Sequence, residues 1–220
     1  MPLNYKTGGG GVDFEPVPAG SHIAVCDIVA DLGMQEGSAL YPKAKQQVYI
    51  RFELPNERIE FEKDGKKVVG PAVIGKTYTA SMNEKANLRH HLESWRGKQF
   101  TDEEAESFDV SAILGKPCML TVMHTQKDGR TYANIAGVGP IPKGISGKTI
   151  IPEITPILYA APDNTSTYGS LPEWLRGKID KQIIIQPSKI NPDADDGAKI
   201  NNGPGWADDG TMIDDSDIPF

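Results

Sequence analysis

Residues 46–54 constrain the fold of this chain more than any other segment, because their apolar side chains recur at every second position. Two sets alternate there: the apolar residues Val48, Ile50, Phe52 and Leu54, and the polar or aromatic residues Gln47, Tyr49, Arg51 and Glu53. A period of two is the pattern of a β-strand that buries one face. We therefore expect a strand whose apolar face joins a core and whose second face meets water or a ligand.

Further strands are predicted on both sides of this segment. Residues 22–32 are rich in β-branched side chains and contain neither Gly nor Pro, which favours a long, partly buried strand. Asp64 and Gly65 mark the tip of one hairpin, and Lys127, Asp128 and Gly129 mark the tip of another. The hairpin strands and one further strand are expected at residues 60–69, 76–82, 117–126 and 130–138.

A helical block interrupts the strands between residues 83 and 114. Asn83 is expected to cap a helix that ends at Gly97, and Thr101 with Glu104 has the spacing of a capping box for a second, short helix. The order is therefore strand, strand, hairpin or strand, helix, and a final strand pair. This order fits a mainly β fold with inserted helices, in the form of a five-stranded Greek-key barrel of the OB-fold type.

The two ends of the chain differ from its centre. Residues 1–20 carry four consecutive Gly followed by Pro16 and Pro18, which favours a flexible arm. A later apolar stripe predicts a short helix that docks back on the barrel; its members are Leu171, Trp174, Leu175 and Ile179. Residues 186–220 hold too few apolar side chains to offset ordering, so we expect one domain over residues 21–185 followed by a disordered acidic tail.

The net charge of −7 is confined to this tail. Residues 191–220 contain eight Asp and one Lys, and the remaining 22 basic and 22 acidic residues cancel. An uncharged body can still present a local basic groove, which the tail can occupy when no other polyanion is bound. The chain shows no targeting or membrane segment, and Cys26 and Cys118 lie in apolar segments typical of buried free thiols, so a cytoplasmic protein is expected.

The tail ends in a short apolar segment, here called the apolar hook (residues 218–220), which follows a run of acidic residues. Its last residues include Asp214, Asp215, Asp217, Ile218, Pro219 and Phe220. Pro219 leaves no helix for the hook to join, so its burial requires a pocket on a partner. This ending closely resembles the C-terminal tip of bacterial and bacteriophage single-stranded-DNA-binding proteins. The resemblance implies that these residues recruit replication, recombination or repair enzymes.

The body of the chain resembles the same class of proteins. The similar runs include Asn83-Glu84-Lys85, Leu92-Glu93-Ser94-Trp95-Arg96-Gly97-Lys98, Leu114-Gly115-Lys116-Pro117-Cys118 and Leu171-Pro172-Glu173-Trp174-Leu175. They are similar to a family of bacteriophage OB-fold single-stranded-DNA-binding proteins encoded near phage recombination genes. The resemblance implies a protein of the bacterial host cell that coats single-stranded DNA without sequence preference and protects it or hands it on. It leaves self-association open.

Such a protein needs aromatic faces for bases and cations for phosphates. Pairs of these residue types share a strand face, and further lysines lie near the first hairpin; the candidate DNA-binding residues are Tyr49, Arg51, Lys76, Tyr78, Arg130, Tyr132, Lys66 and Lys67. Lys43, Lys45 and Lys63 lie in or near loops that could wall the same groove. The remaining large aromatics on these elements are expected in the core: Phe52, Trp95, Phe100 and Phe108.

Enzyme functions are not favoured by the sequence. Residues 146–149 are similar to the end of a phosphate-binding loop. However, Pro142 occupies the place of the first glycine of that loop, and Pro152 prevents a helix from starting after it. The four His and two Cys lack metal-ligand spacing, so neither a metal nor another cofactor is expected. The alternative is an adaptor of a phage replication or strand-annealing complex that mainly binds protein or RNA.

Overall fold

The computed structural model describes residues 16–37, 42–63, 66–145, 147, 150–160 and 165–183. The start of the N-terminal arm, the Asp64 and Gly65 turn, three residues of the 146–149 loop and the acidic tail with its tip lie outside these residues. The elements follow the order β1 (Gly20–Gln35), β2 (Lys45–Lys63), β3 (Lys66–Thr79), α1 (Asn87–Arg96), α2 (Asp102–Ser107), η1 (Val110–Ile113), β4 (Pro117–Lys127), β5 (Arg130–Gly139), β6 (Ile157–Tyr159), α3 (Thr165–Tyr168) and α4 (Glu173–Ile179).

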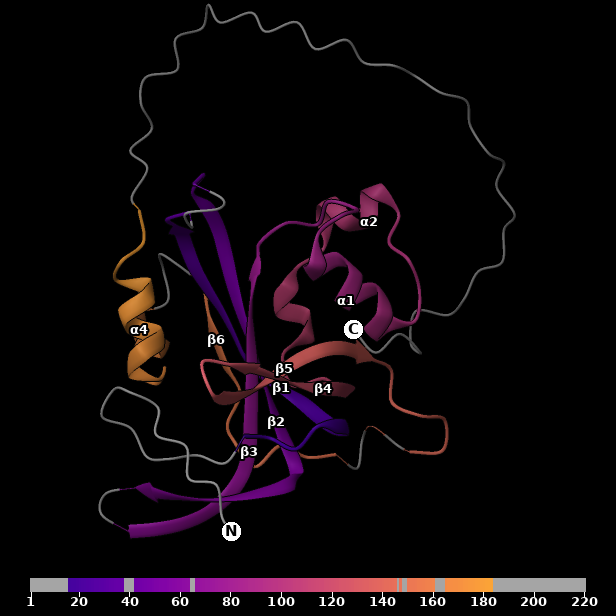
Figure 1. Cartoon of the computed structure of the whole chain (residues 1–220). Coiled ribbons are helices and arrows are strands. Elements are labelled where there is room, and N and C mark those ends of the chain that lie inside the picture. The colour runs from indigo at the N-terminus through magenta and orange to yellow at the C-terminus, as the bar shows by residue number, and fades with distance from the viewer. Residues whose placement is uncertain are drawn as a thin grey trace, which may run out of the picture.

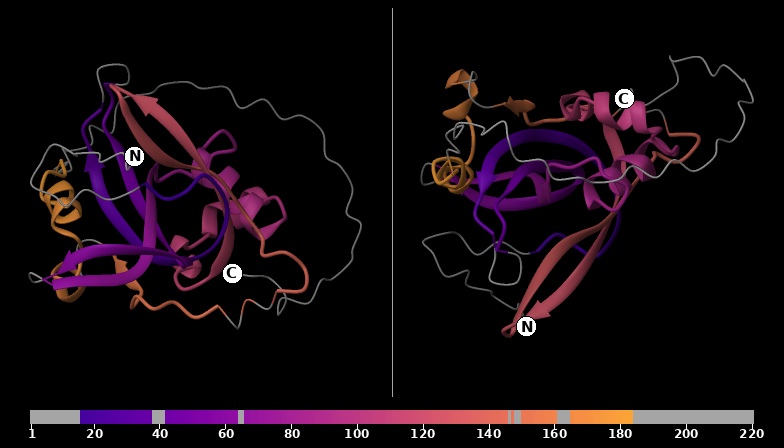
Figure 2. Two further views of the ribbon diagram at one scale, coloured as in Figure 1. Left: turned by 60° about the horizontal axis from the view of Figure 1, so that its bottom comes forward. Right: turned by 90° about the horizontal axis from the view of Figure 1, so that it is seen from above.

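The fold is mainly β, with one strongly curled sheet that forms a half-barrel (Figures 1 and 2). Its strands follow the order β3-β2-β1-β4-β5 in antiparallel pairs, and β6 adds to β1 in parallel. Register shifts interrupt the β1–β2 ladder at two places and the β4–β5 ladder at one, and such bulges increase twist and curl. Across the open side of the curl, Lys76 Nζ on β3 donates a hydrogen bond to the Ile135 carbonyl on β5 at 3.0 Å.

The predicted strands are confirmed, but two of them are longer than expected. Residues 46–54 belong to β2, which continues to Lys63, and the predicted strands at 60–69 and 76–82 are parts of β2 and of the single strand β3. The register jumps from the pair Leu54 and Ala72 to the pair Arg58 and Pro71. Pro55 has no N–H to donate, and the ladder resumes beyond it at Arg58.

The helical block between β3 and β4 confirms two of its three predicted end signals. Gly97 ends α1 at a positive φ of 71°, and Thr101 with Glu104 forms the complete capping box of α2. The predicted cap at Asn83 is wrong, because α1 starts later and Ala86 occupies its N-cap position. The Asn83 side chain instead accepts a hydrogen bond from the Lys85 N–H at 3.1 Å, which forms a turn before the helix.

Two hydrophobic clusters lie on opposite faces of the curled sheet. The larger one fills the curl and takes in Phe52, Trp95 and Phe100 as predicted, with Phe108 packed against it, and it also encloses Cys26 and Cys118 as buried free thiols. The smaller one lies outside the curl, where α4 packs on β1 and β2; its members are Ile28, Ala30, Leu32, Tyr49, Tyr159, Leu171, Leu175 and Ile179. The predicted docking of the C-terminal helix is thus confirmed, and α4 lies on the side of the sheet away from α1 and α2 (Figure 1).

Candidate nucleic-acid interface

The second face of β2 is covered instead of open. Tyr49 is 7% exposed and Glu53 is fully buried. The Tyr49 and Trp174 rings form a T-shaped contact with centroids 5.0 Å apart. Glu53 accepts hydrogen bonds from the backbone N–H groups of Glu153 and Ile154, both at 2.8 Å. The expectation that this face meets water or a ligand is therefore wrong, because the segment after β5 folds back over it.

Arg51 is held inside this second face by a buried carboxylate. Its guanidinium donates to Asp27 through Nε at 2.9 Å and through Nη2 at 2.6 Å, and Asp27 has no exposed surface. Burial raises the pKa of the Asp27 carboxyl, and the hydrogen bonds and charge of Arg51 oppose that rise. Burial likewise raises the pKa of Tyr49 to about 12. Both candidate residues thus have internal partners, and their part in binding DNA stays a prediction.

A groove of about 400 Å³ lies between the C-terminal end of β3 and the loop that leads into α1, and it contains another part of the predicted site. Its lining comprises Lys45, Lys76, Thr77, Tyr78, Thr79, Ser81, Asn83, Lys85, Ala86 and Asn87. Three of these residues are lysines, several carry hydroxyl or amide groups, and no carboxylate is among the described residues that line it. A groove of this composition attracts anions and offers neutral donors around them.

Lys76 and Tyr78 were predicted together, and the structure places both in this groove. Lys76 Nζ lies 5.5 Å from the Tyr78 ring centroid, and partial burial lowers the pKa of Lys76. Tyr78 is only 4% exposed, and its hydroxyl lies 2.8 Å from His91 Nδ1. Lys76 is partly exposed in the groove, whereas the Tyr78 ring is almost fully buried and forms part of the wall.

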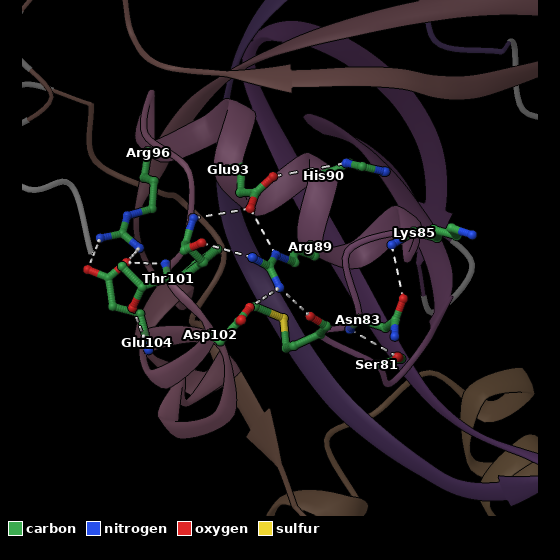
Figure 3. A network of polar contacts seen from close by, with 12 residues as sticks. Ser81, Asn83, Lys85, Arg89, His90, Glu93, Arg96, Thr101, Asp102 and Glu104 are labelled. Carbon is green, nitrogen blue, oxygen red and sulfur yellow. Dashed lines mark hydrogen bonds and ion pairs between the residues drawn. The ribbon is translucent and has the colours of Figure 1, made fainter. Parts of the chain in front are cut away.

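Lys85 reaches the groove from a short, tightly bonded loop that leads into α1 (Figure 3). The Ser81 hydroxyl oxygen accepts from the Asn83 N–H at 3.3 Å, and Asn83 in turn holds the Lys85 N–H. Figure 3 shows the Lys85 side chain extending away from this loop. Lys85 is not among the predicted binding residues. The signal that could have indicated it is an Asn two residues before a Lys at a helix start, which is the spacing of an Asx-turn.

Arg89 anchors this loop to the helical block. This buried side chain of α1 donates to the Met82 carbonyl at 3.2 Å, to the Phe100 carbonyl at 2.8 Å and to Glu93 at 2.9 Å (Figure 3). A guanidinium presents several donors in a fixed plane, so a single residue joins the segment before α1 to the segment before α2. The backbone that carries Lys85 is therefore held in place from the interior.

The other predicted DNA-binding residues lie on two hairpins that project from the sheet (Figure 2). Lys66 and Lys67 are exposed near the end of the β2–β3 hairpin, where Lys67 pairs with Glu60 at 2.6 Å. Arg130 is exposed near the end of the β4–β5 hairpin, and Tyr132 on the same strand is 41% exposed. None of these four lines the β3 groove, so the structure groups the eight candidates into four separate places: the covered face of β2, the groove and the two hairpins.

His91 behind the groove should make the fold sensitive to acid. Burial first, and then the charges of Lys76 and His90, lower the pKa of His91 to about 4 from its ordinary value of 6.5. The unfolded chain therefore binds this proton first as the pH falls. The stability from neutral His91 is complete above pH 6.5 and should be lost progressively toward pH 4.

Urea unfolding at a series of pH values checks this expectation, with His91→Gln as the matched variant. The glutamine amide can still hydrogen-bond the Tyr78 hydroxyl but does not titrate. The difference in free energy of unfolding between the two proteins should change between pH 6.5 and pH 4. A constant difference over that interval would contradict the assignment of the acid sensitivity to His91.

Within the described ranges, no group of three or more His, Cys, Asp or Glu residues is placed to hold a metal ion. The helices in the same part of the chain are all too short or too polar to cross a lipid bilayer. No protein-family model matches the chain, and no curated protein or solved structure matches it either.

Proposed function

We propose that this protein binds single-stranded DNA without sequence preference and has no catalytic activity. The observation that carries the proposal is the groove along β3, where Lys45, Lys76 and Lys85 converge with no carboxylate among the lining residues. Contacts to phosphates position a strand but do not read its sequence, so a site of lysines and hydroxyl groups suits a ligand of any sequence. The charge of each lysine would release a counterion when it meets a phosphate.

The arrangement of the sheet supports an OB-fold as the finer description. The helical block falls between the third and fourth strands, and β3 and β5 approach each other through the Lys76 contact to the Ile135 carbonyl. A five-stranded barrel that closes between its third and fifth strands has this strand order. Proteins with that fold commonly bind single strands across the face that includes the second and third strands.

The proposal extends to the acidic tail. We expect the protein to coat and protect single-stranded DNA during phage replication, recombination or repair in the cytoplasm of the bacterial host. Residues 214–220 would then recruit partner enzymes, because an apolar hook on an acidic approach fits a basic pocket better than it fits DNA. The tail carries the whole net charge of −7, so it repels DNA and competes with it for the groove.

One observation favours the alternative, an adaptor that mainly binds protein or RNA. Two of the three predicted stacking tyrosines, Tyr49 and Tyr78, are buried, which leaves Tyr132 as the exposed one among them. A surface with few open rings would bind single strands mainly through phosphates. The two functions therefore differ in how strongly bare DNA is held by the isolated protein.

Fluorescence anisotropy with labelled oligonucleotides tests the proposed function. The full chain should bind mixed-sequence and homopolymeric DNA with similar affinity, and log K should fall with log salt at a slope of about −2 if three lysines meet phosphates. A matched RNA strand and a DNA duplex serve as competitors. Absence of a complex at any salt concentration would refute the proposal, and clear preference for RNA would support the alternative.

Truncation after residue 190 separates the two halves of the proposal. Because residues 191–220 carry −7, their removal should leave DNA affinity equal or higher, with the largest gain at low salt. The same truncation should abolish binding to a replication or repair enzyme that the full chain retains in a pull-down. A point variant, Phe220→Ala, keeps the charge and should lose only the partner. Loss of DNA affinity in the truncated chain would contradict the assignment of DNA binding to the folded body and of partner binding to the tail.

A further inference from the structure

Trp174 is a large aromatic residue that α4 leaves half in water. The neighbouring apolar residues of this helix, Leu171, Leu175 and Ile179, are at most 3% exposed, whereas Trp174 is 51% exposed. Among the described residues the other tryptophan, Trp95, is 2% exposed. Docking of α4 is therefore achieved by aliphatic side chains, and the exposed indole surface of Trp174 is not needed for it.

The ring of Trp174 is nevertheless held in a defined place. It meets Tyr49 in a T-shaped contact, with an angle of 87° between the ring planes. Tyr49 itself lies across β3, because a Cβ atom at Gly75 would come within 2.0 Å of the Tyr49 hydroxyl. A T-shaped contact occupies at most one face of an indole. Trp174 thus keeps an open face on a rigid support, which lowers the entropy lost when a flat ligand stacks on it.

The position of Trp174 relates it to the lysine groove. Tyr49 on β2 pairs directly with Thr77 on β3, and Thr77 lines the groove. Residues opposite each other in an antiparallel pair share one face of the sheet, so Tyr49, which contacts the indole, lies on the same face as the Thr77 side of the groove. The last turn of α4 adds two cations, Arg176 and Lys178.

We infer that Trp174 is a base-stacking site that continues the lysine groove, so that a single strand held by its phosphates along β3 places a base on the indole; this inference rests on the proposed function. The site takes any nucleobase, because every base has a flat aromatic face. It supplies the open ring that the buried Tyr49 and Tyr78 do not offer. Tyr49 acts here as the support of the stacking ring and does not contact the base.

Binding of two DNA probes to Trp174 variants tests the inference. For a mixed-sequence oligonucleotide, Trp174→Ala should lower affinity about 5- to 100-fold, the effect of one lost stack, and Trp174→Phe should lose less. For an all-abasic strand of the same length, wild type and Trp174→Ala should bind equally. Because stacking involves no counterion, the salt slope of Trp174→Ala should equal that of wild type. Ile151→Ala, which removes another exposed apolar side chain, is the matched control and should bind as wild type does.

Tryptophan fluorescence provides a second readout. Trp206 lies in the acidic tail, so the variant Trp206→Phe removes its emission. In that variant, saturating oligonucleotide should quench the fluorescence of the exposed Trp174 and protect it from quenching by iodide. The fluorescence of Trp95 should stay unchanged. Equal loss of affinity for both probes would overturn the stacking role and assign Trp174 to the docking of α4. Unchanged affinity for the mixed-sequence probe would overturn the site while leaving the lysine groove intact. Failure of wild type to bind either probe would instead refute the proposed function.

Discussion

Arg51→Ala should lower the free energy of unfolding by about 3–5 kcal/mol, because it leaves the buried Asp27 carboxylate without its partner. Asp27 has no exposed surface, and Arg51 supplies two short charged hydrogen bonds to it. Burial already raises the pKa of Asp27, so its protonation favours the folded state. The deficit of the variant should therefore shrink as the pH is lowered. Urea unfolding at several pH values measures both effects.

A double variant shows whether the loss comes from the unpaired charge. Asp27→Leu with Arg51→Met removes both charges at similar volume, and such replacements are often close to neutral, so stability should return to near that of wild type. The same protein decides whether Arg51 contacts DNA. Loss of a phosphate contact would change the salt slope by about 0.7, whereas an internal role leaves the slope unchanged. A double variant as unstable as Arg51→Ala would contradict the ion-pair explanation.

Lys45→Gln combined with Lys85→Gln should produce the largest loss of DNA affinity among the surface variants. Both lysines line the β3 groove, and neither takes part in the hydrogen bond between Lys76 and Ile135. If each meets one phosphate, the salt slope should become shallower by about 1.4, which corresponds to a loss on the order of 50-fold at about 50 mM salt. Anisotropy titrations over a range of salt concentrations measure both quantities.

Lys98→Gln is the matched control for this experiment. Lys98 follows the C-terminal end of α1, far along the helix from Asn87 in the groove, and pairs with Glu104 at 3.3 Å. Its replacement removes one positive charge from the protein, as each replacement in the double variant does, but should leave the slope unchanged. Equal losses in the double variant and in the control would mean that total charge, and not the groove, governs binding.

The strands could be predicted because their signals are local. The alternation in residues 46–54 and the glycine-containing turns depend on neighbours within a few positions, as do the capping box of Thr101 and Glu104 and the Gly97 cap. The cover over the second face of β2 could not be predicted in the same way. Glu53 is bonded to backbone groups about a hundred residues later, and no local pattern indicates such a contact.

The candidate site was predicted in part for the same reason. Lys76 and Tyr78 share a strand, so their proximity follows from spacing alone, and both line the groove. The spacing of two residues on a strand does not show whether a side chain is buried. The burial of Tyr78, whose hydroxyl lies against His91, was therefore not predicted. Lys85 was missed because its place depends on the Arg89 network, in which one side chain binds the carbonyls of Met82 and Phe100, 7 and 11 positions away, and no repeating pattern in the sequence indicates these bonds. The open face of Trp174 depends likewise on Tyr49, which lies in another element.

The hydrogen bond from Lys76 to Ile135 closes a seam between the first and last strands of the sheet order. An ammonium group carries three donors, so Lys76 can keep this bond and still donate to a phosphate. DNA bound there would contact, through Lys76, both of the strands that this hydrogen bond joins. Bound DNA would then oppose the separation of β3 from β5, so the half-barrel should be more stable with DNA than without it.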